Sequence, residues 1–224
     1  MNNPQEYDAW HEQLAGHEFL TEDLHHPWHV TVARLLPDLQ GRTVLEIGCG
    51  RGDFAIWLAI RFPKAHVTAI DFSNAAIEIA KSRARDAAVS VGFAVESAEY
   101  LSFRDRSFDY VVSCECMEHV AYPLHMAKEI HRVLRLGGHF ILTTPNYFNG
   151  MILAWLQSWV LGKPFDSGSN VQPRENFLYS GKLKASCKEA ASMWTRWKAI
   201  NFSGCSFLEP IRESFALKTL PILF

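Results

Sequence analysis

Short apolar runs alternate with segments of helical periodicity through the middle of this chain. The apolar runs predict strands at residues 43–47, 65–70, 91–95, 110–113 and 139–143. The periodic segments predict helices at 53–61 and 74–88, and a third that begins at Pro123 and stops at Gly137-Gly138. Because strands and helices alternate, we expect crossover connections, a parallel sheet and an α/β fold. Right-handed crossovers then bring the loops after the strands to one edge of the sheet.

The two ends of the chain differ in character from this alternating middle. Residues 1–40 are rich in His, Glu and Trp, and we interpret them as helices that cover the sheet. After Pro145 an apolar run at 151–161 is followed by a polar loop. A helix is then predicted at 180–197 and a strand at 198–202. A last strand is expected at residues 214–220.

The length of 224 residues fits one sizeable domain and is too short for two. We divide that single domain into an N-terminal cover (1–40), a ligand-binding core (41–146) and an insert (147–182). Hydrophobic residues make up 48% and charged residues 21%, which is an ordinary globular balance. The net charge of -2 lacks the basic excess that nucleic-acid binders usually carry, so no nucleic-acid partner is expected.

Cysteine usage and the start of the chain favour a cytoplasmic location. The five cysteines are an odd number with no framework spacing, which favours a reducing compartment. The first residues lack the basic and apolar segments of a secretory signal. No stretch reaches the roughly 18 to 20 apolar residues that a membrane span needs.

The most informative segment is 44–53, where an apolar strand runs into glycine at every second position. The pattern is Glu-x-Gly-x-Gly-x-Gly beginning at Glu46, and a helix is predicted to follow at once. Glycine tolerates positive φ and has no Cβ, so such a turn lets backbone N–H groups approach a ligand. This placement is typical of a mononucleotide-binding unit. The dinucleotide fingerprint would need glycine where this chain has Asp53, which argues against a nicotinamide-dependent oxidoreductase.

Four blocks of sequence, in the same order, resemble those of the class I S-adenosylmethionine-dependent methyltransferases. The glycine turn resembles the family's first motif, and residues 67–73 resemble its second strand, which ends in an acidic residue. Residues 108–120 resemble the fourth strand and its loop, and 134–144 resemble the glycine turn before the fifth strand. The blocks cover roughly residues 40–146. Within the family they are loosely similar to the small-molecule branch that includes ubiquinone-pathway methyltransferases.

The resemblance implies a Rossmann-like, seven-stranded, mainly parallel sheet in the order 3-2-1-4-5-7-6, with N-terminal cover helices. It also implies residues for S-adenosylmethionine. Asp71 is expected to accept hydrogen bonds from both ribose hydroxyls, although an interaction with the dipole of the next helix is the alternative. Glu46 is expected to support the glycine loop and the methionine end, or to make only a local bond to loop amides. The other residues expected around the cofactor are Gly48, Cys49, Gly50, Gly52, Phe72, Ser97, Ala98, Glu99 and Cys114.

Two of these positions leave alternatives open. Ser97 stands where the family often has Asp, and a serine would accept the adenine amino proton more weakly than a carboxylate. Ala98 is expected to contribute its backbone N–H. Phe72 is expected either to pack against the adenine ring or to belong to the core.

The loop after the fourth predicted strand is the usual site of methyl transfer in the family. This chain lacks the Asn/Asp-Pro-Pro-Tyr sequence of enzymes that methylate amino groups of bases or glutamine, which argues against that type. Glu118 and His119 are the candidate catalytic residues, because a His of near-neutral pKa can accept a hydroxyl proton. The alternative is structural, with Glu118 facing the cofactor pocket and His119 capping the backbone. Tyr7 and Trp10 either close over the cofactor or pack in the core.

Three further features each have a structural as well as a functional interpretation. The Cys114-x-Cys116-x-x-His119 spacing has no second Cys pair nearby, so no metal site is expected. The cluster of His25, His26 and His29 is interpreted as a polar surface of the N-terminal cover. The segment 151–163 is a buried core helix, an apolar lid over the acceptor, or a weak membrane-surface contact supported by nearby lysines.

The function that the resemblance implies is methyl transfer from S-adenosylmethionine to a small, apolar or aromatic acceptor, with oxygen favoured as the acceptor atom. The products are S-adenosylhomocysteine and the methylated acceptor. One alternative is a catalytically silent protein that binds the cofactor or another protein. A nicotinamide-dependent oxidoreductase is the weaker alternative.

Overall fold

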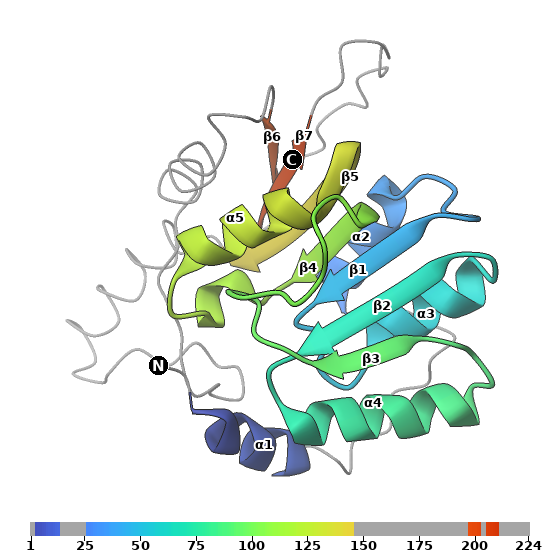
Figure 1. The fold of residues 1–224 in the computed structure, drawn as a ribbon, viewed down its shortest axis with the longest axis vertical. Coiled ribbons are helices and arrows are strands. Elements are labelled where there is room, and N and C mark those ends of the chain that lie inside the picture. Colours follow the sequence, from blue (N-terminus) through green and yellow to red (C-terminus); the bar gives the residue numbers. More distant parts are fainter. Residues whose placement is uncertain (1–2, 14–25, 146–196, 203–204, 211–224) are drawn as a thin grey trace.

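The computed structural model describes residues 3–13, 26–145, 197–202 and 205–210, which build a seven-stranded sheet with flanking helices (Figure 1). The strand order is β3-β2-β1-β4-β5-β7-β6. The strands are β1 (Thr43–Ile47), β2 (His66–Asp71), β3 (Gly92–Val95), β4 (Phe108–Cys114), β5 (Leu134–Pro145), β6 (Trp197–Phe202) and β7 (Cys205–Pro210). The helices are α1 (Pro4–Gln13), α2 (Pro27–Leu35), α3 (Asp53–Arg61), α4 (Asn74–Asp86) and α5 (Pro123–Val133), with a 3-10 turn η1 (Met117–His119).

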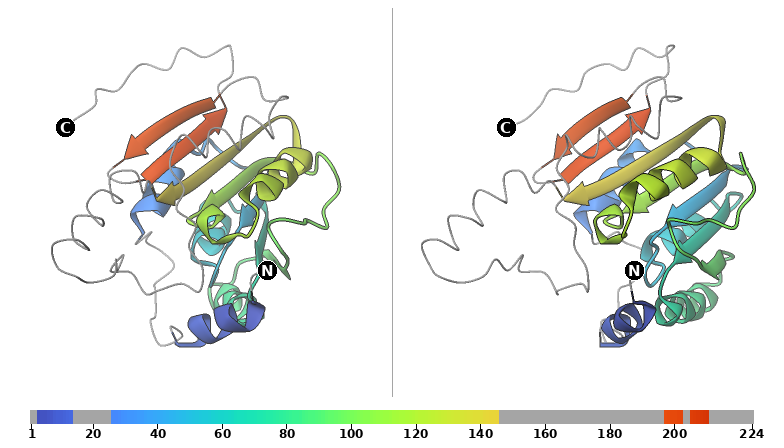
Figure 2. Two further views of the ribbon diagram at one scale, coloured as in Figure 1. Left: turned by 90° about the vertical axis from the view of Figure 1, so that its left-hand side faces the viewer. Right: turned by 60° about the vertical axis from the view of Figure 1, so that its left-hand side comes forward.

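The five strands β1 to β5 pair in parallel, as the alternation of apolar runs and helices predicts. The Rossmann-like α/β class and the order of these five strands are confirmed. Beyond β5, the strands β7 and β6 form an antiparallel hairpin that pairs with β5 through β7 (Figure 2). The register places Ile47 of β1 opposite Ile70 of β2 and Ser113 of β4. The carboxyl ends of these three strands therefore meet at one place on the sheet edge.

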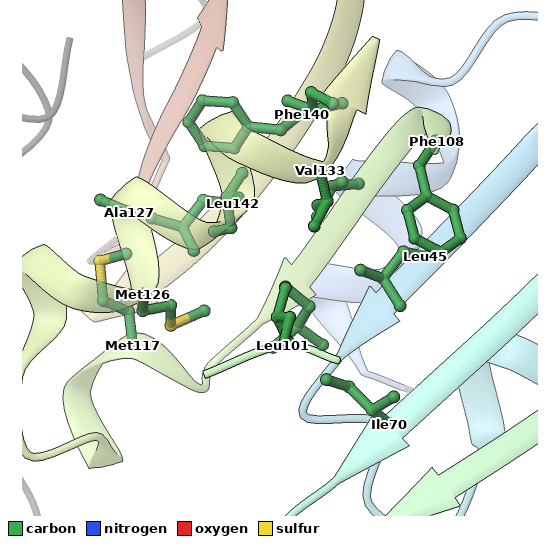
Figure 3. Close-up of a cluster of buried hydrophobic side chains, with 14 of the residues drawn as sticks. Leu45, Ile70, Leu101, Phe108, Met117, Met126, Ala127, Val133, Phe140 and Leu142 are labelled. Atoms are coloured by element: carbon green, nitrogen blue, oxygen red, sulfur yellow. The ribbon is translucent and has the colours of Figure 1, made fainter. Parts of the chain in front are cut away.

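Alternation of side chains along the strands gives the sheet two apolar faces. Leu45 of β1 packs in a cluster with Met126 and Val133 of α5 (Figure 3). Its neighbour Val44 belongs to a second cluster with Phe54 of α3, on the opposite face. Fully burying a side chain of this size stabilises a fold by about 1.5–3 kcal/mol, so both layers fix the strands that carry the edge loops.

The helix α1 lies against α4, at the edge of the sheet next to β3 (Figures 1 and 2). Asp8 of α1 accepts hydrogen bonds from the Ser73 hydroxyl at 2.6 Å and from the Ala75 backbone N–H at 3.0 Å. Ser73 is the N-cap of α4, and its own hydroxyl oxygen accepts from the Ala76 N–H. The backbone N–H groups at the start of α4, which have no partner within the helix, are thus bound by the Ser73 cap and by the Asp8 side chain of α1.

Two strand positions differ from the sequence-based prediction. The helix α5 ends at Val133, and β5 begins at once with Leu134, so Gly137-Gly138 lies inside the strand. The β4–β5 register shifts there, and Gly137 has φ +75°. At Gly138 a Cβ would lie 3.0 Å from the Asp109 carbonyl oxygen, so glycine permits a close backbone approach in the sheet and does not terminate the helix.

The last strand also lies elsewhere in the chain. We expected it at 214–220, but β7 spans Cys205–Pro210 and follows β6 closely, which lets the two strands form a tight hairpin. The predicted strand at 198–202 corresponds to β6. Several predicted segments fall outside the described residues. These are the insert (147–182), with its candidate lid or membrane contact (151–163), and the segment 214–220. The helix predicted at 180–197 also lies outside them, except for its last residue. Among the described helices, none combines the length and apolarity that crossing a bilayer requires.

The histidine expected on a polar surface of the cover, His29, is instead packed between helices. Its ring stacks on Phe54 of α3 with centroids 4.9 Å apart, and the ring of His26 contacts it edge-on at 5.3 Å. Burial lowers the pKa of His29 to about 4, and the neighbouring His26 lowers it further. His29 is therefore neutral at physiological pH, and protonation opposes its burial.

We predict that His29 by itself lowers the free energy of unfolding by about 2 kcal/mol between pH 7 and pH 5, because the unfolded chain takes up a proton there and folded His29 does not. The raised pKa values of Glu46 and Glu115 act in the opposite direction, so the contribution of His29 is the difference between the wild type and His29→Phe. His29→Phe keeps an aromatic ring against Phe54 and should remove this loss. Urea unfolding at both pH values measures it, with His66→Asn, at an exposed position, as the control. An equal pH dependence in the wild type and in His29→Phe would contradict the assignment.

Candidate functional site

The turn between β1 and α3 is a left-handed glycine loop. Gly48, Gly50 and Gly52 have φ values of +75°, +51° and +81°. A Cβ on Gly48 would lie 2.6 Å from the side chain of Cys116, and one on Gly52 would lie 2.9 Å from the Cβ of Ala80. Glycine is therefore required at these two positions both for the backbone conformation and for the approach of the loop after β4 and of α4.

Asp71, at the end of β2, holds this loop in place. Its Oδ2 accepts a hydrogen bond from the Gly50 N–H at 2.8 Å, and its Oδ1 accepts one from the Ser73 N–H at 2.9 Å. The N–H groups of Gly48 and Cys49 both donate to the Ile70 carbonyl at 2.9 Å. The carboxylate thus joins the glycine loop to the start of α4, and its remaining lone pairs are available to a ligand.

A cleft of about 460 Å³ opens at this edge of the sheet. It is lined by the ends of β1 and β2, by a wall at residues 96–100, by the loop after β4 and by α1. Eight of the expected site residues line the cleft: Gly48, Gly50, Asp71, Phe72, Ser97, Ala98, Glu99 and His119. The volume is in the range of small-molecule sites.

The other expected site residues do not line the cleft: Glu46, Cys49, Gly52, Cys114 and Glu118. Cys49 and Cys114 are buried in the cluster between the sheet and α3, where burial raises the pKa of both thiols. Gly52 is the N-cap of α3 and packs against α4. These five residues pack around the cleft and do not form its lining.

Glu46 is a buried carboxyl in β1, only 2% exposed. Burial, and then the negative charges of Asp53 and Asp71, raise the pKa of Glu46 to about 8. No hydrogen-bond donor among the described residues reaches its Oε2. Glu46 is therefore predominantly protonated at neutral pH, so in this structure it supports the loop from below as a neutral group.

The wall at residues 96–100 is fixed by its own polar side chains. The Ser97 hydroxyl accepts a hydrogen bond from the Glu99 N–H at 3.2 Å. The Glu99 carboxylate accepts one from the Tyr122 N–H at 2.5 Å, which ties this wall to the loop before α5. Phe72 lines the cleft beside these residues, and its ring meets that of Tyr7 edge-on at 6.2 Å. An adenine-sized group would find Phe72 and the Ser97-Ala98 backbone on the same side.

Glu118 and His119 are brought together after β4. Glu118 is 1% exposed, and its Oε2 accepts a hydrogen bond from the Thr144 hydroxyl at 3.0 Å. Its Oε1 lies 3.6 Å from Nε2 of His119. His119 lines the cleft, whereas Glu118 stands behind it. The pair has the arrangement of an imidazole oriented by a buried carboxylate.

Sequence reasoning missed several residues of the cleft. Glu96, Glu115 and Cys116 line it, as do Pro4 and His11 of α1. Glu115, between Cys114 and Cys116, carries no motif signal. The helix α1 reaches the cleft only through contacts between residues far apart in the sequence. Tyr7 and Trp10 do line the cleft, which supports the interpretation that α1 closes over a ligand.

Buried polar atoms on α1 support a polar ligand in this cleft. Trp10 Nε1 and His11 Nδ1 have no hydrogen-bond partner among the described residues. Together with Asp71 and the glycine loop they supply donors and acceptors around an otherwise apolar space. S-adenosylmethionine, which has a diol, an aromatic base and an amino-acid end, fits this donor set. Within the described ranges, no group of three metal-ligating side chains is present.

The cleft lies in a segment with recognisable relatives. Residues 44–138 match a family model described as a methyltransferase domain. A ubiquinone biosynthesis O-methyltransferase from Alkalilimnicola ehrlichii is 38% identical over 116 residues, which are 51% of this chain and 46% of that protein. A demethylmenaquinone methyltransferase from Listeria welshimeri is 32% identical over 117 residues, or 51% and 50% of the two chains. The chain thus spans about half the length of these curated relatives.

Solved structures agree on the fold. The crystal structure of an S-adenosylmethionine-dependent methyltransferase from Aquifex aeolicus superposes with a TM-score of 0.65. The match covers 93% of this chain and 98% of that one at 16% identity, which supports the fold alone. The glycine loop and the strand order agree with this match, so residues 44–138 correspond to a methyltransferase domain within a fold shared with S-adenosylmethionine-dependent methyltransferases.

Proposed function

We propose that this chain transfers a methyl group from S-adenosylmethionine to a small, apolar or aromatic molecule, with a hydroxyl oxygen as the acceptor. The observation that carries the proposal is the continuity of the cleft. Asp71 and the glycine loop line the same cleft as His119 and the apolar residues Val120 and Ala121. One cavity thus carries polar groups suited to the donor and apolar groups suited to the acceptor.

The donor end is assigned to groups that the sheet edge fixes. In this proposal the Asp71 carboxylate binds the ribose hydroxyls, since each of its oxygens keeps a lone pair after binding a backbone N–H group. The adenine is bound by Phe72, Ser97 and Ala98. Glu46 and the glycine loop support the methionine end. When bound, the donor supplies an activated methyl on a sulfonium, so the protein contributes orientation and electrostatics.

The acceptor end is assigned to the loop after β4. In this proposal His119 contacts the acceptor, and the buried Glu118 carboxyl group orients the imidazole ring. Holding the acceptor oxygen in line with the methyl carbon and sulfur gives most of the rate gain that such a site can provide. The names of the relatives support a small-molecule acceptor, because the two named above belong to quinone biosynthesis.

Incubation with labelled S-adenosylmethionine and a panel of phenols, quinols and lipids tests the proposal. A labelled product with S-adenosylhomocysteine release supports it. Tight binding of S-adenosylhomocysteine without turnover of any acceptor would favour the alternative, a silent cofactor-binding protein. A thermal shift with NAD and none with S-adenosylhomocysteine would favour the oxidoreductase.

We predict that Asp71→Asn weakens binding of S-adenosylhomocysteine roughly ten- to over a hundredfold, about 1.5–3 kcal/mol, because a charge-assisted contact is lost. The amide still offers an oxygen to one of the two backbone N–H groups, so the loop has a partner. Calorimetry gives the affinity, and thermal unfolding checks the fold. Asp86→Asn, on the exposed end of α4, is the matched control. Unchanged affinity would remove Asp71 from the site.

We predict that His119→Gln lowers turnover by about 10- to 100-fold, because the acceptor loses a positioning contact, while donor affinity stays the same. The comparison uses the acceptor that the panel identifies, with S-adenosylhomocysteine affinity measured in parallel. A variant with full turnover contradicts the assignment of His119, and a variant with weakened donor binding places it at the other end of the cleft.

A further inference from the structure

Glu115 is held in an unusual backbone conformation at the end of β4. Its φ of +49° lies in the left-handed region, which non-glycine residues rarely occupy and which costs of order 1–3 kcal/mol. The Glu115 N–H donates both to the Thr143 carbonyl at 3.1 Å and to the Thr143 hydroxyl at 3.2 Å. The neighbouring strand β5 therefore imposes the conformation, and the residue it fixes lines the cleft.

The carboxyl group of Glu115 has little to stabilise a negative charge. Its Oε1 is sealed from solvent and has no hydrogen-bond partner among the described residues. The Thr143 side chain hydrogen-bonds the carboxyl group and favours its charged form. Burial outweighs this contact and raises the pKa of Glu115 to about 7. A carboxylate so placed is a far stronger proton acceptor than an exposed one.

The other carboxylates that line the cleft are occupied. Asp71 accepts two backbone N–H groups, as described above. Glu96 accepts the hydroxyl and the N–H of Ser102, and Glu99 accepts the Tyr122 N–H. Glu118 stands behind His119 and does not reach the cleft. Of the acids described at this site, Glu115 combines a place in the wall with a carboxyl oxygen that nothing satisfies.

We infer that Glu115 is a catalytic residue that accepts the proton of the acceptor's hydroxyl during methyl transfer. The inference rests on the proposed function and names the group that its chemistry requires. The acceptor O–H bond breaks, and its proton passes to the Glu115 carboxylate. The oxygen's electron pair forms the new bond to the methyl carbon, and the pair of the broken carbon–sulfur bond stays on sulfur. When the methylated product leaves, Glu115 releases the proton to water that enters the cleft, which it lines.

The sign of the pH dependence follows from this role. A proton acceptor works only when ionised, so kcat/KM should rise as the pH rises through about 7 and then level off. A cationic donor in the cleft favours the carboxylate, so the inflection in kcat should lie at lower pH. The other titratable groups that face the cleft are His11, Asp71, Glu96, Glu99, Cys116 and His119. The phenols Tyr7, Tyr100 and Tyr122 line it as well, and Cys114 and Glu118 lie behind the same loop.

The first experiment needs no acceptor. Infrared difference spectra of the S-adenosylhomocysteine complex, recorded between about pH 6 and pH 8, should show loss of a protonated-carboxyl band on raising the pH. Glu115→Gln should lose the part of that band that titrates near pH 7, while Glu78→Gln, on the exposed face of α4, should retain it. S-adenosylhomocysteine affinity should stay within about twofold in both variants. Glu46 also titrates near this range, so the band is assigned by its loss in Glu115→Gln.

The second experiment measures turnover of whichever phenol or quinol the wild type methylates. Glu115→Gln should lower kcat by about 100-fold or more and abolish the inflection of kcat/KM near pH 7. Glu115→Asp, which keeps the carboxylate one methylene further away, should restore part of the activity.

The outcomes separate the two proposals. Failure of the wild type to bind S-adenosylhomocysteine, or binding without turnover of any acceptor, would overturn the proposed function itself. Turnover by the wild type together with full turnover and an unchanged pH profile in Glu115→Gln would overturn the role of Glu115. Absence of the carboxyl band from the wild-type complex would also overturn it. If Glu115→Gln fails to fold, the wild-type pH profile and Glu115→Asp decide the question.

Discussion

The arrangement at the sheet edge depends on one carboxylate, that of Asp71. Its two oxygens bind one N–H in the glycine loop and one at the start of α4, at 2.8 and 2.9 Å. Two turns that follow different strands are thereby fixed relative to each other. Charge-assisted hydrogen bonds of this kind are about twice as strong as neutral ones, and here they act on backbone groups that a ligand also needs. A donor that binds Asp71 therefore meets a loop that is already ordered.

The rest of the fold serves to present this edge. Parallel strands buried on both faces leave few degrees of freedom, because Leu45 and Val44 are locked in opposite clusters. The register then fixes which loop residues meet: Gly48 against Cys116, and Gly52 against Ala80. Each contact leaves no room for a Cβ. Sequence variation at these glycines is thus restricted by packing as well as by backbone conformation.

Most of the parallel strands and the position of the cleft can be predicted from local sequence patterns. Apolar runs located β1 to β4 to within one or two residues at most boundaries, and the glycine spacing with Asp71 located the cleft. The same reasoning failed where contacts with residues far away in the sequence determine the conformation or the burial of a residue. Gly137-Gly138 looks like a helix stop, but its role is to let β5 approach the Asp109 carbonyl. Cys49 and Cys114 stand at the expected positions of the motif, but their side chains pack in the buried cluster that contains Phe54 of α3. Glu115 carries no motif signal, because its conformation is imposed by Thr143 of β5.

The attachment of α1 has a thermodynamic consequence. This helix contributes Tyr7, Trp10 and His11 to the cleft, and Asp8 anchors it to the start of α4. A short segment near a chain end opens at lower free energy than the central sheet does. Any molecule that binds the cleft and contacts α1 must then shift that opening equilibrium. By reciprocity, whatever detaches α1 weakens retention of the molecule by the same factor, which makes this helix a natural point of allosteric control.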